Sequence, residues 1–163
     1  MMAKDYLGQV KSKEARIRNL RRDKESIKDM LYSLGGAGTG ERVQASRNID
    51  KFGTLYSRID EMERQIDSEI ASLMMFKMKV SDEINHMKTD RYMTVLNCRY
   101  IHFQSWEKIA EDAFPEPYTV RYILKLHGLA LLEFGEIYKK MLDNMDKKSQ
   151  ESSLNDTKRH LCS

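Results

Sequence analysis

Proline, cysteine and long apolar segments are scarce in this sequence. Its 163 residues include 2 prolines and 2 cysteines. The two cysteines, Cys98 and Cys162, can form at most one bridge, so no disulfide framework is predicted, and a reduced state fits a cytosolic protein. No apolar run approaches the roughly 20 residues of a membrane-spanning helix, and the N-terminus lacks the apolar core of a signal peptide. We therefore expect a cytoplasmic protein with no membrane partner.

Helix-breaking residues are concentrated in two places. Pro115 and Pro117 are the only prolines, and four of the 8 glycines lie between Gly35 and Gly40. A glycine costs a helix about 1 kcal/mol relative to alanine, and a proline removes an amide donor. Charged residues make up 33% of the chain, which suits solvated helical faces. The composition therefore predicts an all-α protein.

Two long segments carry apolar residues at heptad spacing. The first runs from Ala3 to Leu34, and the second runs from about Ser46 to Met87. The second would be about 60 Å long, so its apolar seam has to pack on another helix, and the first segment is the nearest candidate. We predict an antiparallel coiled-coil hairpin over 3–88, a stalk, with a glycine-rich loop near 35–45. Such a stalk can also form a homo-oligomer.

Two charged residues at seam positions suggest how these helices align. Pairing Lys24 with Glu69 across the hairpin also places Leu20 near Leu73. A shift by one heptad would instead place Leu20 near Ile66 and leave both charges beside apolar partners, although long side chains can reach water from a narrow seam. We predict the alignment that pairs Lys24 with Glu69.

A group of three helices is predicted over 89–142. The first begins at Asp90, the expected cap, and ends near His102. Ser105 offers a hydroxyl to the free amides of a second helix that runs to about Phe114. The two prolines follow, and Thr119 caps a third helix whose inward stripe is predicted at Val120, Ile123, Leu126, Ala130 and Leu131. Short helices joined by tight turns are typical of a helix-turn-helix domain.

The residues of this domain resemble a known family. They read Arg99-Tyr100, then Ser105-Trp106-Glu107-Lys108-Ile109-Ala110, then Thr119-Val120-Arg121, His127-Gly128 and Ala130-Leu131. This pattern resembles the promoter-reading C-terminal domain of bacterial sigma factors. It is most similar to the version found in small phage and prophage proteins of uncharacterised function, akin to late-operon transcriptional regulators. Leu129 departs from the family, which tends to place Arg or Lys there.

The resemblance implies double-stranded DNA as the partner and the third helix as the reading element. If Ile123 and Leu126 face inward, Arg121, Tyr122 and Lys125 face outward near the helix N-terminus, the end that enters the major groove. Arg121 can offer a guanidinium fork to guanine, and Lys125 can reach a base or a phosphate. Further DNA-binding candidates lie around the turns, at Ser105, Lys108 and Thr119.

Charge is distributed unevenly along the chain. Residues 89–142 carry seven charges of each sign, a weak electrostatic footprint for DNA binding. The first long helix is basic, with a cluster formed by Arg16, Arg18, Arg21 and Arg22. This cluster is interpreted either as a solvated helix face or as a contact to phosphate or to a partner protein.

No residue pattern predicts an enzyme, a metal site or a cofactor. Cys98 and His102 are four apart, but two ligands do not close a zinc site. His127 is interpreted as structural, and no catalytic triad or carboxylate pair is visible. The glycine-rich segment follows no strand and precedes no Gly-Lys-Ser/Thr, so it does not predict a phosphate-binding loop. The polar segment 143–163 is predicted to be a disordered tail.

Two functional hypotheses follow. The first is a phage or prophage transcriptional regulator in the cytoplasm of a bacterial host, which reads DNA and recruits host RNA polymerase or replaces part of its sigma factor. The second is an oligomeric assembly protein, for example the DNA-recognition subunit of a phage packaging machine.

Overall fold

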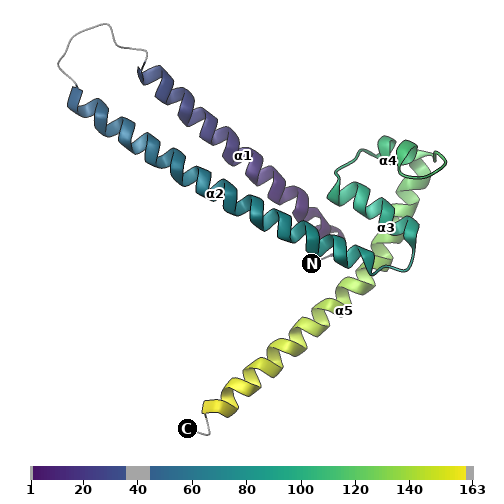
Figure 1. The fold of residues 1–163 in the computed structure, drawn as a ribbon. Coiled ribbons are helices and arrows are strands. Elements are labelled where there is room, and N and C mark those ends of the chain that lie inside the picture. The colour runs from purple at the N-terminus through teal and green to yellow at the C-terminus, as the bar shows by residue number, and fades with distance from the viewer. Residues whose placement is uncertain (1, 36–44, 161–163) are drawn as a thin grey trace. The chain divides into compact units, whose positions relative to one another are not determined.

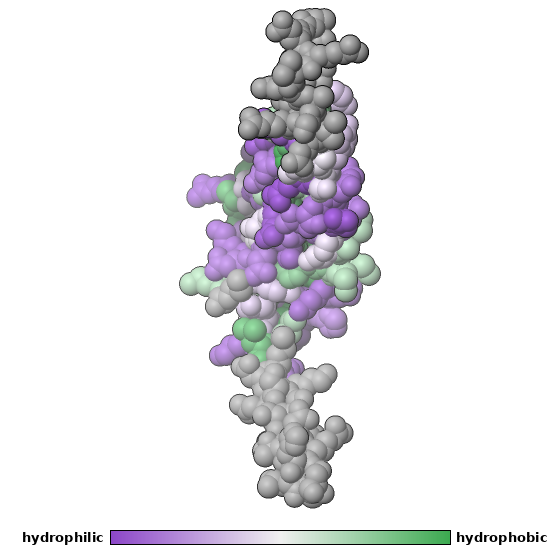
Figure 2. All heavy atoms as spheres, turned by 90° about the vertical axis from the view of Figure 1, so that its left-hand side faces the viewer, coloured by the Kyte–Doolittle hydropathy of each residue, from purple (hydrophilic) through white to green (hydrophobic). Residues whose placement is uncertain are grey.

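The computed structural model describes residues 2–35 and 45–160. The described residues are helical and contain no strand, which confirms the all-α prediction (Figure 1). Hydrophilic residues cover most of the coloured surface in the space-filling view, with smaller apolar areas between them (Figure 2). The elements are, in order, α1 (Ala3–Gly35), α2 (Ala45–Asn85), α3 (Asp90–Leu96), the π-helical turn η1 (Asn97–Ile101), α4 (Trp106–Asp112) and α5 (Val120–His160).

The chain divides into two compact units. One, the two-helix unit, comprises Gln9–Lys77. The other, the head unit, comprises Met1–Gly8 together with Met78–Ser163. The glycine-rich loop predicted near 35–45 lies outside the described residues over 36–44.

In the two-helix unit, α1 and α2 lie antiparallel. The Lys13 ammonium donates to Ser72 Oγ at 3.1 Å, and the Lys24 ammonium lies 3.1 Å from Glu63 Oε1. The residue numbers of the partners on α2 thus fall as those on α1 rise, which is the order of an antiparallel pair. The buried residues of this unit recur at heptad spacing, as the two apolar seams require. They are Val10, Ile17, Leu31, Ile59, Met62, Ile66 and Leu73.

The predicted alignment of these helices is wrong by one heptad. Lys24 forms an ion pair with Glu63. Glu69 forms one with Arg16, in which Arg16 Nε lies 2.9 Å from Glu69 Oε1. The side chains of Lys24 and Glu69 are 18% and 19% exposed. The aliphatic parts of Lys24 and Glu69 therefore occupy seam positions, while their charged ends reach partners beside the seam. Each charge is paired without a contact between Lys24 and Glu69.

The head unit is built around an apolar cluster shared by three helices. Val95 of α3, Ile109 and Ala110 of α4, and Ile123 and Leu126 of α5 form this cluster. All five are buried, as is Ala130. The inward positions predicted for the second helix are therefore buried, and so are Ile123, Leu126 and Ala130 of the third. The other two predicted positions of that stripe, Val120 and Leu131, are only half-buried. On the first helix the cluster member is Val95, and the next residue, Leu96, is buried outside this cluster.

The start of α3 differs from the prediction. Thr89, not Asp90, is the N-cap, and its side chain does not bond the helix amides. Glu133 of α5 binds the segment before the helix: its Oε1 accepts from the amides of Lys88 at 2.7 Å and Thr89 at 3.3 Å, and its Oε2 accepts from the Thr89 hydroxyl at 2.9 Å. A carboxylate distant in sequence thus fixes the two residues that lead into α3.

Two further boundaries differ. The first predicted head helix is α-helical only to Leu96, after which η1 continues to Ile101 and Phe103 adopts a positive φ of 54°. The disordered tail predicted over 143–163 is wrong as far as His160, because α5 continues to that residue. No proline or glycine follows Gly135. A polar composition deprives a helix of a packing face, but it does not break the backbone hydrogen bonds.

Candidate nucleic-acid interface

The turn before α4 is held by Ser105, one of the predicted site residues. Its hydroxyl accepts a hydrogen bond from the amide of Lys108 at 3.2 Å, as an N-cap residue does. Ser105 and Lys108 are both exposed. Ile109 and Ala110, the next two residues, are buried in the cluster. The helix is therefore anchored by its second half, and Lys108 remains accessible to solvent.

The first turns of α5 carry the other predicted site residues. Thr119 Oγ1 accepts from the amide of Tyr122 at 3.3 Å, so this side chain caps the helix. Arg121 and Lys125 are exposed, and Ile123 between them is fully buried. Because residues two apart on a helix point to different sides, burial of Ile123 directs both basic side chains outward.

Tyr122 differs from the other predicted site residues. It is half-buried and packs against the apolar cluster. Its ring lies 4.8 Å from the ring of Tyr118, centroid to centroid. Much of this side chain therefore contributes to the packing around the cluster, although the prediction placed it on the outer face with Arg121 and Lys125.

A stack of four side chains joins η1, α4 and α5. Its members all belong to the motif that carries the family resemblance, but no contact among them was predicted from the sequence. The Arg99 guanidinium lies 4.2 Å above the Trp106 ring, and Trp106 meets His127 edge-on at 4.9 Å. The Tyr100 hydroxyl and His127 Nε2 are 3.1 Å apart. Arg99 also donates to the carbonyl of Gln104 at 2.8 Å. The stack therefore attaches the first turn of α4 to the side of α5.

The environment of His127 keeps it neutral. Burial lowers the pKa of His127, and the positive charges of Lys4 and Arg99 lower it further. A neutral imidazole can hold the hydrogen bond to Tyr100 at neutral pH without adding a buried charge. The sequence places His127 four residues after Ile123, hence on a neighbouring turn of the same helix face, and its interpretation there is structural.

The arginine cluster of α1 is divided by the structure. All four arginines are exposed, and among them Arg16 forms an ion pair with Glu69. These four residues belong to the two-helix unit, and the other predicted site residues belong to the head unit.

Residues 2–35 and 45–160 form neither a metal-ligating cluster nor a membrane-spanning helix. No group of three or more His, Cys, Asp or Glu side chains there could hold a metal ion. Cys98 is half-buried, and burial raises the pKa of its thiol, which disfavours the reactive thiolate. None of the helices in those ranges is apolar over a length sufficient to cross a membrane.

Comparisons with protein-family models, with curated proteins and with solved structures found no match to this chain.

Proposed function

We propose that this protein is a DNA-binding transcriptional regulator that reads the major groove with the N-terminal turns of α5. One observation carries the proposal: Arg121 and Lys125 are exposed at the start of a capped helix whose other side is anchored by Ile123 and Leu126. A reading helix needs this combination, because base contacts are specific only if the backbone that presents them is rigid.

The resemblance to sigma-factor promoter-reading domains suggests the biological setting. It supports a phage or prophage regulator in the bacterial cytoplasm that acts on double-stranded DNA and contacts host RNA polymerase. Arg121 is proposed to read guanine, and Lys125 a base or a phosphate. Ser105, Lys108 and Thr119 are proposed to bind the phosphate backbone, and the exposed edge of Tyr122 to lie against DNA.

The charge balance of 89–142 makes a specific prediction about affinity. With seven charges of each sign, few phosphates are neutralised, so binding should be modest and should depend only weakly on salt. Polymerase would then supply part of the binding energy at a promoter.

The test begins with a DNA site selected from a random duplex library by the full chain. Arg121→Ala should weaken binding to that site by about 1 to 3 kcal/mol and barely change non-specific binding. Lys125→Ala should lower the slope of log K against log salt by about 1 if its contact is to phosphate.

Lys139→Ala is the matched control. It removes the same charge from the same helix, 18 residues or about 27 Å further along, and Lys139 is exposed. Equal affinity of the Arg121→Ala and Lys139→Ala proteins for the selected site, with helicity unchanged by circular dichroism, would exclude base reading by Arg121.

A second function, that of an oligomeric assembly protein such as a DNA-recognition subunit of a packaging machine, is favoured by a different observation. Met74 and Met75 on α2 are 62% and 74% exposed. Adjacent exposed methionines are common on adaptable protein-binding surfaces. The mass in solution separates the two functions: a ring of many copies would favour packaging, and a monomer or dimer would favour transcription.

A further inference from the structure

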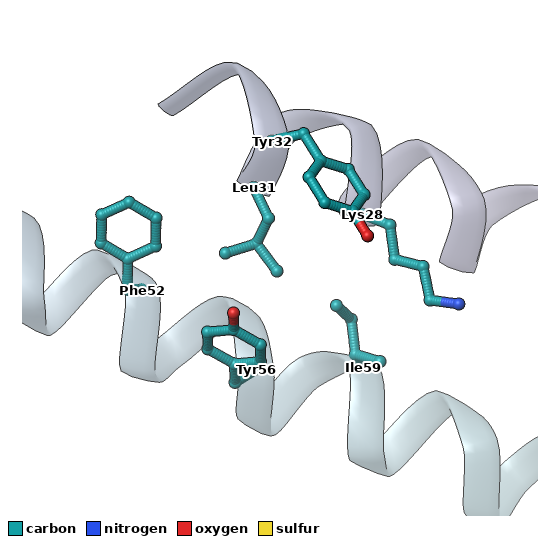
Figure 3. Close-up of a pocket in the computed structure, with 6 residues that line it drawn as sticks. All are labelled: Lys28, Leu31, Tyr32, Phe52, Tyr56 and Ile59. Carbon is teal, nitrogen blue, oxygen red and sulfur yellow. The ribbon is translucent and has the colours of Figure 1, made fainter. Parts of the chain in front are cut away.

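A groove opens between α1 and α2 near the ends that the loop joins (Figure 3). Its volume is about 420 Å³. Leu31, Phe52 and Ile59 provide apolar walls, and Lys28, Tyr32 and Tyr56 complete the lining. The two tyrosines are 78% and 60% exposed although each is a large, mostly apolar side chain. Two neighbouring exposed tyrosines beside an apolar groove are typical of a surface that a binding partner covers.

The groove identifies one face of the two-helix unit, which we call the tyrosine face. Heptad steps back from Tyr32 along α1 reach Glu25, Arg18 and Lys11, and those from Lys28 reach Arg21 and Glu14, so basic residues outnumber acidic ones at these positions. On α2, Asp60 lies one turn after Tyr56, and further heptad steps reach Asp67 and Met74. The tyrosine face therefore has a basic edge on α1 and an acidic edge on α2.

The charges on these two edges are largely unpaired within the chain. Among the residues that the structure describes, Arg18, Arg21, Asp60 and Asp67 take part in no ion pair and are exposed. The acids beside them are mostly occupied: Glu63 pairs with Lys24, and Glu25 pairs with Lys28. Glu14 is the one acid on the basic edge that stays half-buried without such a pair in the described chain.

The other face of the unit has a different character. Arg16 lies two residues before Arg18 and points to the other side, where it pairs with Glu69. Lys13 bonds Ser72 there, and three serines complete a polar lining with them. The charged groups on this face, Lys13, Arg16 and Glu69, are bonded within the chain, so it offers less to a partner than the tyrosine face does.

We propose that the tyrosine face binds the tyrosine face of a second copy of this chain, which gives a two-fold symmetric four-helix bundle. Two arrangements of antiparallel hairpins can place these faces together. A two-fold axis perpendicular to the helices would set α1 on the partner's α1, basic edge against basic edge. An axis parallel to the helices sets α1 on the partner's α2, basic edge against acidic edge. Charge complementarity selects the second arrangement.

The same arrangement covers the groove. Tyr32 and Tyr56 line one groove and so lie at a similar height along the unit. An axis parallel to the helices preserves that height, so Tyr32 of each copy meets Tyr56 of the other. The four rings then close both grooves and remove their apolar walls from water, which supplies the hydrophobic part of the association.

Sedimentation velocity on the full chain over a range of concentrations provides the test. The wild type should sediment as a dimer. Arg18→Glu with Arg21→Glu makes the basic edge acidic, and Asp60→Lys with Asp67→Lys makes the acidic edge basic, so each double variant alone should have at least tenfold weaker self-association. Lys51→Glu with Arg58→Glu is the matched control, because it changes the charge equally at exposed residues on the other side of α2.

Mixing the two interface variants is the decisive step. In a mixed dimer, the acidic α1 edge of one copy faces the basic α2 edge of the other, and the remaining pair of edges is unchanged. Dimers should therefore reappear on mixing, at wild-type helicity by circular dichroism. A monomeric wild type, an assembly larger than a dimer, or variants that fail to complement each other would overturn the proposal.

This inference does not depend on DNA binding. All its residues lie in the two-helix unit, whereas Arg121 and Lys125 lie in the head unit. Loss of dimers and loss of DNA recognition can therefore be observed separately.

Discussion

At the scale of single residues, Glu133 makes three long-range hydrogen bonds in the head unit. It joins α5 to the segment before α3 by accepting from two amides and one hydroxyl. Partial burial acts to raise the pKa of Glu133, but the hydrogen bonds from Lys88 and Thr89 outweigh it, so the pKa lies below its ordinary value of 4.5. The ionised carboxylate therefore stabilises the folded state.

Glu133→Gln should make the head unit less stable at pH 7 by about 1 kcal/mol or more, because the glutamine side chain has one acceptor oxygen where the carboxylate has two. A group with a lowered folded pKa stabilises above its unfolded pKa, and that stabilisation is lost as the pH falls through the folded pKa. The difference between wild type and variant should thus shrink below pH 4.5. Urea unfolding followed by Trp106 fluorescence at several pH values measures it, since Trp106 is the only tryptophan and packs on the apolar cluster.

Glu136→Gln is the control, because Glu136 is exposed. It should change stability little at any pH. A gap between wild type and Glu133→Gln that stays constant from pH 7 to pH 4 would show that the hydrogen bonds of Glu133 to Lys88 and Thr89 do not depend on ionisation.

At the scale of elements, the sequence predicted features that depend on neighbouring residues and missed contacts between residues far apart in the chain. Ser105 and Thr119 cap their helices as predicted, because an N-cap depends on residues within one turn. Glu133 was missed because its partners are 44 and 45 residues away. The Arg99, Trp106 and His127 stack was missed for the same reason. No sequence signal known to us distinguishes η1 from an ordinary helical turn.

The alignment of α1 and α2 shows where periodicity reaches its limit. Every heptad shift keeps apolar residues on the seam, so only polar residues can distinguish one alignment from another. The prediction assumed that Lys24 and Glu69 would pair with each other. In the structure their long stems allow each charge to reach a flanking partner, Glu63 or Arg16, which sequence spacing alone does not reveal.

A cysteine pair tests this alignment. Leu20 lies midway between Arg16 and Lys24, and Ile66 lies midway between Glu63 and Glu69, so the two ion pairs place Leu20 opposite Ile66. With Cys98 and Cys162 replaced by Ser, Leu20→Cys with Ile66→Cys should oxidise readily within one chain. Leu20→Cys with Leu73→Cys is the comparison, and preferential oxidation of that pair under the same conditions would restore the originally predicted alignment.

At the scale of the whole molecule, the two compact units are not simple consecutive segments. Tyr6, near the N-terminus, stacks on Tyr138 at 4.7 Å and on Phe134 at 6.4 Å, so residues 1–8 belong to the head unit. Burial raises the pKa of the Tyr6 phenol, and the neighbouring Glu83 raises it further. The predicted division at residue 88 followed the end of the heptad pattern, whereas the units divide at Met78. Periodicity cannot reveal such a contact between chain ends.

Two units with separate cores should respond separately to core mutations. Ile66 is buried in the two-helix unit, and Ile123 is buried in the head unit. Each change to Ala should cost about 2 to 5 kcal/mol in its own unit through lost burial and a cavity. Ile123→Ala should lower the midpoint of the Trp106 fluorescence transition in urea. Ile66→Ala should leave that midpoint nearly unchanged and instead shift the circular dichroism transition, to which the long helices α1 and α2 contribute strongly. Each variant is the other's control, and equal displacement of both transitions by either variant would mean that the chain unfolds as one cooperative unit.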